Sequence, residues 1–350
     1  MATPNPTLDA ARKRLAQRSK PASTNTNGKG LAAEKVPEKG QELMDAATGQ
    51  VLGKPTIPSD YAAMGVSYGF SPPPPAALTM VITGLSGVGK TTFVSSIPKA
   101  LVVSFRPHGA KGVIGARAAN VYLRSWADWD RLRTKLIADG PNPSRPYDTV
   151  VFDTSDEWFN PLAEKIIADW NERASKPVTS IGDVGQKGKG FSEVGALLMQ
   201  ELRAIQTAGY GWIATGHLIE KSLEINGMMT TKLRVVLAPS CYGQLVQAAF
   251  IKAQIIPFME TTKQVTRKLP DGRSVKRTVA IPEAERVFEY RLTIRAGDAD
   301  FDAKTNLPDL PPYVAVPVRN GWDAFATAYQ AAVERGQQLQ NQILSGNVSE

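Results

Sequence analysis

The feature that most constrains this chain is a glycine-rich segment that follows an apolar run, residues 81–92 (VITGLSGVGKTT). Gly84 to Thr91 fits the pattern G-x-x-x-x-G-K-[S/T] at every position, with strand-like residues before it and a helix-forming run after it. Main-chain N–H groups in such a turn point into one concavity, and the helix N-terminus adds partial positive charge. An ordinary glycine-rich turn is the alternative, but the complete motif with both flanks favours a phosphate-binding loop. The segment predicts binding of a nucleoside triphosphate.

Each position of this loop has an expected role. Lys90 is expected to reach the β- and γ-phosphates, and the hydroxyl of Thr91 is expected to coordinate Mg²⁺. We therefore expect ATP and Mg²⁺ as ligands. The residues predicted to contact the nucleotide are Gly84, Leu85, Ser86, Gly87, Val88, Gly89, Lys90, Thr91 and Thr92.

Composition narrows the class of protein. Of the 350 residues, 42% are hydrophobic, which is enough for a substantial core, and the net charge of +8 is compatible with a polyanionic partner. The single cysteine, Cys241, excludes an internal disulfide framework and fits a reducing compartment. Because no apolar run approaches the ~20 residues that cross a bilayer, we expect a soluble intracellular protein with no membrane partner.

Residues 1–75 differ from the rest of the chain. They hold ten of the 25 prolines and none of the six tryptophans, and they end in a polyproline spacer at 72–75. Such a segment buries too little apolar surface to offset the entropy lost on ordering, so we predict a disordered leader. The leader is either a simple solvated segment or a tether for DNA or a partner protein.

From Ala76 onward, apolar strands alternate with helical patterns, which predicts an α/β fold with a mostly parallel sheet flanked by helices. Strands are expected at 78–83, 100–105 and 120–123, and helices at 91–96 and 126–139. In the second helix an apolar face is predicted from four side chains: Trp129, Leu132, Leu136 and Ile137.

A second chemical landmark is the strand Thr149 to Asp153 (TVVFD). An apolar strand that ends in aspartate places a carboxylate at the carboxyl edge of a parallel sheet, where ligands bind in open α/β folds. We therefore predict that Asp153 holds Mg²⁺, directly or through water. Asp156 and Glu157 follow at once, and either is able to orient the attacking water or simply to favour the helix dipole.

A helix is expected at 157–173, a basic loop at 176–190, a helix at 192–209 capped by Ser192, and a strand at 210–215. The loop carries Lys187 and Lys189 among glycines. It is either a contact for a nucleic-acid backbone or a mobile solvated loop.

This order of parts resembles the RecA-like branch of P-loop ATPases, and more narrowly the phage-encoded Sak-type ATPases associated with single-strand annealing. The resemblance spans about residues 78–312 and rests on four segments: GLSGVGKTT at 84–92, YDTVVFDTSDEW at 147–158, GFSEVGALLMQEL at 190–202 and GWIATGHL at 211–218. It implies a RecA-like core, magnesium-dependent ATP hydrolysis and coupling to single-stranded DNA during recombination. It also implies His217 as the sensor of the γ-phosphate. The candidate catalytic residues are therefore Lys90, Asp153, Glu157 and His217.

The chain departs from that resemblance at one place. Enzymes of the RecA type carry a catalytic glutamate at the end of the strand after the phosphate-loop helix, and this chain has Ser104, Phe105 and Arg106 there. The water-activating base is therefore open between Asp156, Glu157, Asp128 and a group from a neighbouring subunit. Arg106 is either a phosphate ligand or a surface arginine.

Beyond His217 the pattern turns to β-structure. Hairpins are predicted around Asn226-Gly227 and around residues 270–272, whereas 242–256 fits either a helix or a strand pair. The second hairpin concentrates cations, which predicts either DNA contact or a solvated charged surface. The predicted DNA contacts are Lys187, Lys189, Arg267, Lys268, Arg273, Lys276 and Arg277. The resemblance to RecA-like ATPases also implies candidates for a finger that reaches a neighbour's γ-phosphate, namely Arg291, Arg295 and Lys304.

The sequence thus predicts a leader at 1–75, an ATPase core at 76–315, and a C-terminal helix and tail at 316–350. The predicted function is an oligomeric ATPase that acts on single-stranded DNA in recombination or annealing, in the cytoplasm of a bacterial host if a bacteriophage encodes it. The alternative is a nucleotide-dependent switch or loader that assembles with a replication or recombination protein, with the leader as its contact. A small-molecule kinase fits less well, because the sequence offers neither an arginine-rich lid nor an acceptor pocket.

Overall fold

The computed structural model describes most of the chain from residue 58 onward. The described residues are 58–64, 69–107, 109–186, 188–225, 228–259, 261–268, 274–283, 288–294, 304–305, 307, 309–317 and 319–344. They all belong to one compact unit, Lys54–Ser345. Most of the predicted leader, together with Lys187, Arg273 and Arg295, lies outside the described residues.

The core is one mixed sheet with the strand order β12-β10-β7-β1-β5-β4-β2-β3. Its strands are β1 (Thr79–Gly84), β2 (Ala100–Ser104), β3 (Ala119–Tyr122), β4 (Thr149–Phe152), β5 (Gly211–Ile225), β7 (Ile251–Met259), β10 (Phe288–Thr293) and β12 (Tyr313–Val316). The neighbouring strands from β7 to β3 all run parallel, whereas β10 and β12 are antiparallel to their neighbours. This confirms the predicted α/β fold with a mostly parallel sheet.

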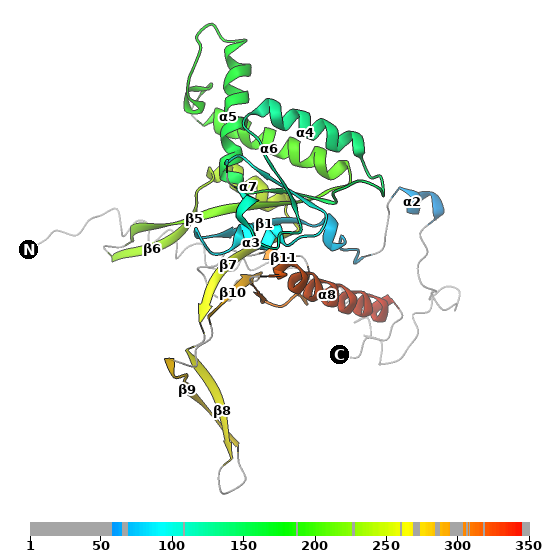
Figure 1. Cartoon of the computed structure of the whole chain (residues 1–350), viewed down its shortest axis with the longest axis vertical. Helices are drawn as coiled ribbons and strands as arrows, with labels where there is room; N and C mark the ends of the chain where they lie inside the picture. The colour runs from blue at the N-terminus through cyan, green and yellow to red at the C-terminus, as the bar shows by residue number, and fades with distance from the viewer. Residues whose placement is uncertain are drawn as a thin grey trace, which may run out of the picture. The chain divides into compact units, whose positions relative to one another are not determined.

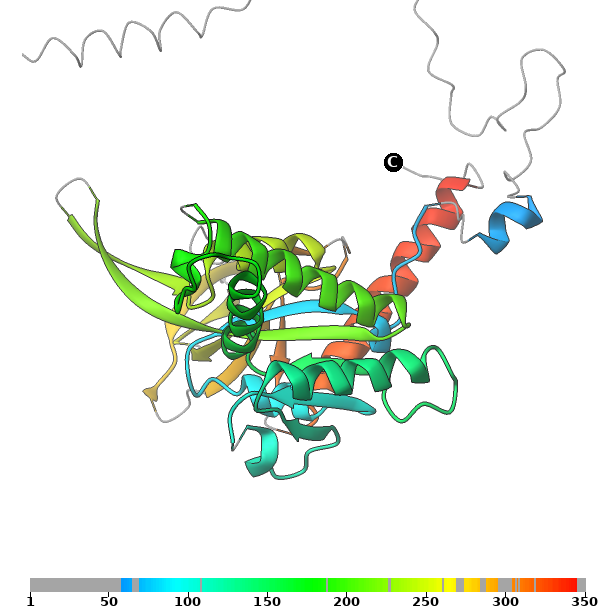
Figure 2. The same ribbon diagram turned by 90° about the horizontal axis from the view of Figure 1, so that it is seen from above.

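Helices cover both faces of this sheet (Figure 1). One face carries α4 (Trp126–Asp139), α5 (Ser155–Asn171), α6 (Lys189–Thr207) and α7 (Pro239–Ala248), and the other carries α3 (Lys90–Ser95) and α8 (Gly321–Leu344). Within the first layer, α4 and α6 run side by side (Figure 2). Because β1, β2 and β4 are covered on both faces, every one of their residues is buried, which explains their predominantly apolar sequences.

Smaller elements complete the fold. They are α2 (Ser59–Ala63), β6 (Met228–Val235), β8 (Thr262–Lys268), β9 (Ser274–Ala280), β11 (Lys304–Thr305) and the short 3-10 turns η1 (Pro75–Ala77), η2 (Ala110–Gly112) and η3 (Ile181–Asp183). Both predicted hairpins are present. β5 continues past the core and pairs with β6 (Figure 2), and β8 pairs with β9 as a separate two-stranded sheet.

An aromatic cluster packs behind β4, the strand that leads to Asp153. The rings of Phe152 and Trp158 stack with centroids 3.9 Å apart, and Trp129 lies 5.3 Å from each of them at a steep angle. All three side chains are fully buried. Trp158 therefore belongs to the core, and it fixes the first turn of α5 against the sheet.

A buried carboxylate ties α4 to α6. Glu201 is fully buried, and it accepts hydrogen bonds from Trp129 Nε1 at 2.9 Å and from Arg133 Nη1 at 2.7 Å. Burial raises the pKa of Glu201, although the hydrogen bond from Trp129 and the charge of Arg133 oppose this shift.

We expect Glu201→Ala to lower the free energy of unfolding by about 1–3 kcal/mol, because it leaves the buried indole N–H of Trp129 without an acceptor and Arg133 paired only with Asp130. Urea unfolding followed by tryptophan fluorescence measures this change. The control is Glu193→Ala on the same helix, whose half-exposed side chain should cost under about 1 kcal/mol. Equal effects of the two substitutions would contradict the structural role of the Glu201 pair.

Four local predictions were wrong. The helix predicted at 192–209 begins at Lys189 after Gly188, which has a φ of 81°, so Ser192 lies inside the helix and does not cap it. Ile137 is 42% exposed, because α4 presents a narrower apolar stripe than expected. The strand predicted at 210–215 runs on to Ile225, and the loop predicted at 176–190 contains η3. The ambiguous segment 242–256 lies in both α7 and β7.

No helix in the described part of the chain combines the length and the apolar character that crossing a bilayer requires.

Candidate nucleotide-binding site

The phosphate-loop motif lies at the carboxyl edge of the parallel strands, between β1 and α3. β1 ends at Gly84, and α3 begins at Lys90, with Gly89 as its N-cap residue at a φ of 88°. Gly87 also has a positive φ, 81°, and a Cβ on Gly87 or Gly89 would face open space. The backbone therefore takes a conformation that side chains disfavour, and the concavity of the loop stays unobstructed.

Gly84 is required for a different reason, which is close packing. A Cβ at this position would lie 2.8 Å from the carbonyl oxygen of Ile255 and 2.8 Å from Val88 Cγ2. We expect Gly84→Ala to destabilise the protein by about 1–3 kcal/mol through overpacking, seen as a lower midpoint of thermal unfolding. The control Gly243→Ala lies in α7 with open space around it and should be neutral or stabilising. A wild-type midpoint for Gly84→Ala would contradict the close approach.

Lys90 is held inside the loop. Its Nζ donates hydrogen bonds to the carbonyl oxygens of Gly84 at 2.9 Å and Leu85 at 2.8 Å, and the residue is 5% exposed. Burial lowers the pKa of Lys90, and the nearby carboxylates of Asp153 and Asp156 oppose that shift. The ammonium group therefore lies against the carbonyl oxygens of its own loop, at the edge of the concavity where an anion would bind.

Asp153 joins the phosphate loop to two neighbouring strands. It follows β4, and its Oδ2 accepts a hydrogen bond from Thr91 Oγ1 at 2.7 Å. Its Oδ1 accepts a second one from Thr215 Oγ1 at 2.5 Å. Since β5 lies between β1 and β4, Thr215 reaches Asp153 from the strand that separates the two motifs. The carboxylate is buried and held by a hydroxyl on each oxygen.

His217 extends this arrangement further along β5. Its Nδ1 lies 2.9 Å from Asp156 Oδ2, and its backbone N–H donates to Asp156 Oδ1 at 3.1 Å. Burial alone would raise the pKa of Asp156, but the hydrogen bonds and charge of His217 lower it overall. The imidazole is thereby fixed in orientation by the first turn of α5.

A cavity of about 330 Å³ brings these groups together. Its lining residues are Thr91, Ser104, Arg106, Pro107, Gly109, Asp153, Thr154, Glu157 and His217. The structure thus brings the predicted residues Thr91, Asp153, Glu157 and His217 to one cavity beside the phosphate loop. Asp128, a proposed alternative base, instead caps the start of α4 and pairs with Arg124 and Arg131.

The residues of this cavity fit a magnesium–nucleotide complex. Mg²⁺ prefers carboxylate and hydroxyl oxygens, and Thr91 and Asp153 present both kinds at one point. Two residues that line the cavity, Thr154 and Glu157, each have a buried side-chain oxygen (Oγ1 and Oε2) without a hydrogen-bond partner. Buried polar atoms are rarely left unpaired, so these two atoms indicate that the cavity is built for a polar ligand.

Glu157 is a carboxylate of this cavity whose pKa is raised. Burial raises its pKa, and the charge of Arg106, with which it forms an ion pair, partly opposes this rise. Single ligand atoms of Asp156, Glu157 and His217 all lie within 4.8 Å of one another. Of these three residues, Glu157 and His217 line the cavity.

A second, larger cavity lies next to the first. It has a volume of about 690 Å³ and is lined by Asp156, Phe159, Asn160, Gly188, Phe191, Val236, Leu237, Ala238, Pro239 and Ser240. The rings of Phe159 and Phe191 stack with centroids 6.1 Å apart. Asp156 lines this cavity, and its partner His217 lines the first, so one hydrogen-bonded pair separates the two spaces.

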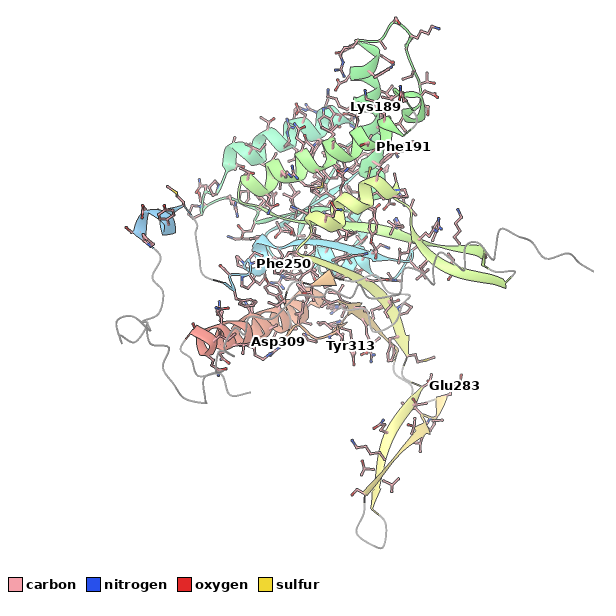
Figure 3. The ribbon with its side chains drawn as sticks, turned by 180° about the vertical axis from the view of Figure 1, so that it is seen from behind. Lys189, Phe191, Phe250, Glu283, Asp309 and Tyr313 are labelled. Carbon is pink, nitrogen blue, oxygen red and sulfur yellow. The ribbon has the colours of Figure 1, made fainter. Side chains whose placement is uncertain are left out.

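The predicted DNA contacts lie apart from the phosphate loop. Lys189 lies in the first turn of α6, two residues before Phe191 (Figure 3), where it pairs with Glu193 at 3.6 Å and lies 5.6 Å from the ring of Trp170. Lys276 is an exposed residue of β9. Arg267 and Lys268 lie in β8 and Arg277 in β9, but only their backbones are described.

Of the three finger candidates, Arg291 is described in full. Its guanidinium lies 3.2 Å from the ring centroid of Phe258 and 4.1 Å from that of Tyr313, and it pairs with Glu289. It therefore packs against its own chain. Lys304 lies in β11, where its backbone pairs with Lys252.

Sequence reasoning missed Thr215 and Thr154. The sequence around Thr215 indicates only a buried apolar strand. The feature that could have identified Thr215 is its position at the carboxyl edge of β5, beside β4. Arg106 was left open between a phosphate ligand and a surface arginine. Its pairing with Glu157 depends on how β2 and α5 approach each other, which no local pattern encodes.

Comparison with known protein families agrees with this geometry. Residues 76–240 match the model of the AAA domain family. The matched segment runs from just before β1 to the start of α7. The match covers slightly less than half of the chain, and it supports a nucleotide-binding P-loop domain similar to the AAA family in that segment. No curated protein matches the chain. The region from β7 to α8 lies beyond the family match, although β7 pairs directly with β1.

Proposed function

We propose that this AAA-type domain binds Mg-ATP on the phosphate loop and hydrolyses it. The observation that carries the proposal is the meeting of Lys90, Thr91 and Asp153 at one edge of the sheet. Lys90 would leave the loop carbonyls for the β- and γ-phosphates. Bound through Thr91 and Asp153, Mg²⁺ would neutralise charge on the phosphate oxygens.

Glu157 is the proposed acceptor of the water proton. Water attacks the γ-phosphorus, the bond from that phosphorus to the β,γ-bridging oxygen breaks, and ADP and inorganic phosphate leave. Glu157 suits this role because its buried carboxylate lines the cavity and its raised pKa makes it a stronger base than an exposed carboxylate. His217 would contact the γ-phosphate with the ring nitrogen that does not bond Asp156.

We further propose that ATP turnover serves recombination or annealing of single-stranded DNA, in a homo-oligomer of a phage-encoded protein in the bacterial cytoplasm. The support is the resemblance to Sak-type ATPases, the net charge of +8 and the exposed lysines of α6 and β9. The stacked pair Phe159 and Phe191 in the second cavity is also of the kind that binds unpaired bases.

The test is the ATPase rate with and without single-stranded DNA, together with DNA retention across a salt series. We expect DNA to raise the rate. We also expect the double variant Lys189→Ala/Lys276→Ala to lower the salt slope of binding by about one to two units, since each lysine lost removes up to one phosphate contact. Lys135→Ala on α4 is the matched exposed control. Absence of DNA retention at ~50 mM salt would contradict the DNA proposal.

A nucleotide-dependent switch or loader is the second candidate. The specific observation in its favour is that the end of β2 carries no carboxylate, while Glu157 is engaged by Arg106. Such a protein would assemble with a replication or recombination partner, with the leader as a contact, and turn over ATP slowly. Light scattering with and without ATP tests it, and an unchanged monomer would reject nucleotide-dependent self-assembly.

A further inference from the structure

Arg106 occupies an unusual place at the edge of the nucleotide cavity. It follows β2, and it lines the same cavity as Thr91 and Asp153. Its side chain is 66% exposed, whereas the carboxylate of its partner Glu157 is only 13% exposed. The ion pair therefore joins Arg106, whose exposed side chain is free to turn, to Glu157, whose side chain is held by its surroundings.

The pair is also incomplete. Arg106 Nε faces Glu157 Oε1, while Glu157 Oε2 is buried without a hydrogen-bond partner. An arginine that satisfies a carboxylate fully donates to both oxygens in parallel. The observed contact therefore uses only one of the two carboxylate oxygens.

A terminal phosphate offers Arg106 a stronger partner. The guanidinium fork matches two phosphate oxygens at once, whereas its contact with Glu157 uses one carboxylate oxygen. The carboxylates of Asp153, Asp156 and Glu157 surround this part of the site, so a triphosphate needs further positive charge here. Arg106 is the arginine that lines the cavity, and its exposed side chain is able to turn.

We propose that Arg106 binds the terminal phosphate of the bound triphosphate and leaves Glu157 when it does so. This inference rests on the proposed function. The exchange makes Arg106 the group that distinguishes ATP from ADP, because ADP lacks the phosphate that would draw it away. It also frees Glu157 Oε1 for the attacking water only when a triphosphate is present.

Equilibrium binding tests the exchange directly. The probes are ADP and the non-hydrolysable β,γ-imido analogue of ATP, each titrated with Mg²⁺ into the full chain. We expect Arg106→Ala to weaken binding of the triphosphate analogue about tenfold or more, and to change ADP affinity less than about twofold. Arg106→Lys keeps the charge without the fork and should fall between the two.

A well-matched control exists in α4. Arg131 is 77% exposed and pairs with the 14% exposed Asp128, so Arg131→Ala removes a similar ion pair away from the cavity. It should change neither affinity. Circular dichroism confirms that each variant is folded. Equal weakening of both nucleotides by Arg106→Ala, or no weakening of either, would overturn the proposal.

A double-mutant cycle tests the link to Glu157. Glu157→Gln removes the charge that holds Arg106, so it should tighten binding of the triphosphate analogue about two- to fivefold. This gain should vanish in Arg106→Ala/Glu157→Gln, and a gain that persists there would overturn the exchange. Failure of the wild type to bind either nucleotide would refute the proposed function as well. Wild-type ATP binding that Arg106→Ala leaves intact refutes only the present inference.

Discussion

Lys90→Ala is expected to weaken ATP binding by at least about 100-fold. The variant loses a buried ammonium group that would make two or more charge-assisted hydrogen bonds to the β- and γ-phosphates, each contributing about 1.5–3 kcal/mol. In the free protein this group donates to Gly84 and Leu85, so its position is already set before a nucleotide arrives. Isothermal titration calorimetry with Mg-ATP measures the loss.

Lys135→Ala supplies the comparison for this prediction. Lys135 is 71% exposed and pairs with Asp139 on the surface of α4. Its removal changes the net charge of the protein by the same amount as Lys90→Ala. ATP affinity that falls equally in both variants would show a long-range effect of charge, and unchanged affinity in Lys90→Ala would show that the loop does not bind phosphate.

Asp153→Asn is expected to lower kcat for ATP hydrolysis at least about 100-fold. The amide keeps the shape of the side chain, and its oxygen is still able to accept the hydrogen bond from Thr91 or Thr215. The negative charge that attracts Mg²⁺ is lost, and with it the neutralisation of charge on the transferred phosphoryl group. Steady-state hydrolysis across a magnesium titration measures this effect.

Two features of that titration identify the cause. Asp153→Asn should need much more Mg²⁺ for any residual rate, while nucleotide affinity measured without Mg²⁺ stays close to that of the wild type. Asp139→Asn, a surface change on α4, should leave both quantities unchanged. A wild-type magnesium dependence in Asp153→Asn would show that Asp153 does not serve the metal.

The phosphate loop and Asp153 are the parts of the site that local sequence determines, and both were predictable. The loop from Gly84 to Thr91 needs particular residues at fixed spacing, and Asp153 needs only an apolar strand before it. Thr91 Oγ1 lies 2.7 Å from Asp153 Oδ2, because β1 and β4 are parallel and end at the same edge of the sheet. The phosphate loop and Asp153 are therefore predictable from residue spacing and from the place of each residue at the end of an apolar strand.

The remaining part of the site depends on tertiary contacts. Thr215 touches Asp153 because β5 inserts between β1 and β4, and strand order is not written in any single strand. The pairing of Arg106 with Glu157 joins residues about 50 positions apart in sequence. Both contacts arise from packing, so composition and spacing could not reveal them.

The same distinction holds for the fold. The strands of the parallel core are continuous apolar runs and were found within a residue or two at nearly every boundary. The sequence of residues 242–256 fitted either a helix or a strand pair, because the end of α7 and the start of β7 both lie in this range, with a short connection between them. The start of α6 was misplaced because Gly188, with its positive φ, replaces the expected serine cap.

The most direct test of the account is the structure of the protein with Mg²⁺ and the β,γ-imido analogue of ATP. We predict that the triphosphate lies in the loop of residues 84–91, that Lys90 Nζ has moved from the Gly84 and Leu85 carbonyls to phosphate oxygens, and that Thr91 and Asp153 face the metal. A loop that stays empty at saturating nucleotide, or a nucleotide bound elsewhere on the chain, would contradict it.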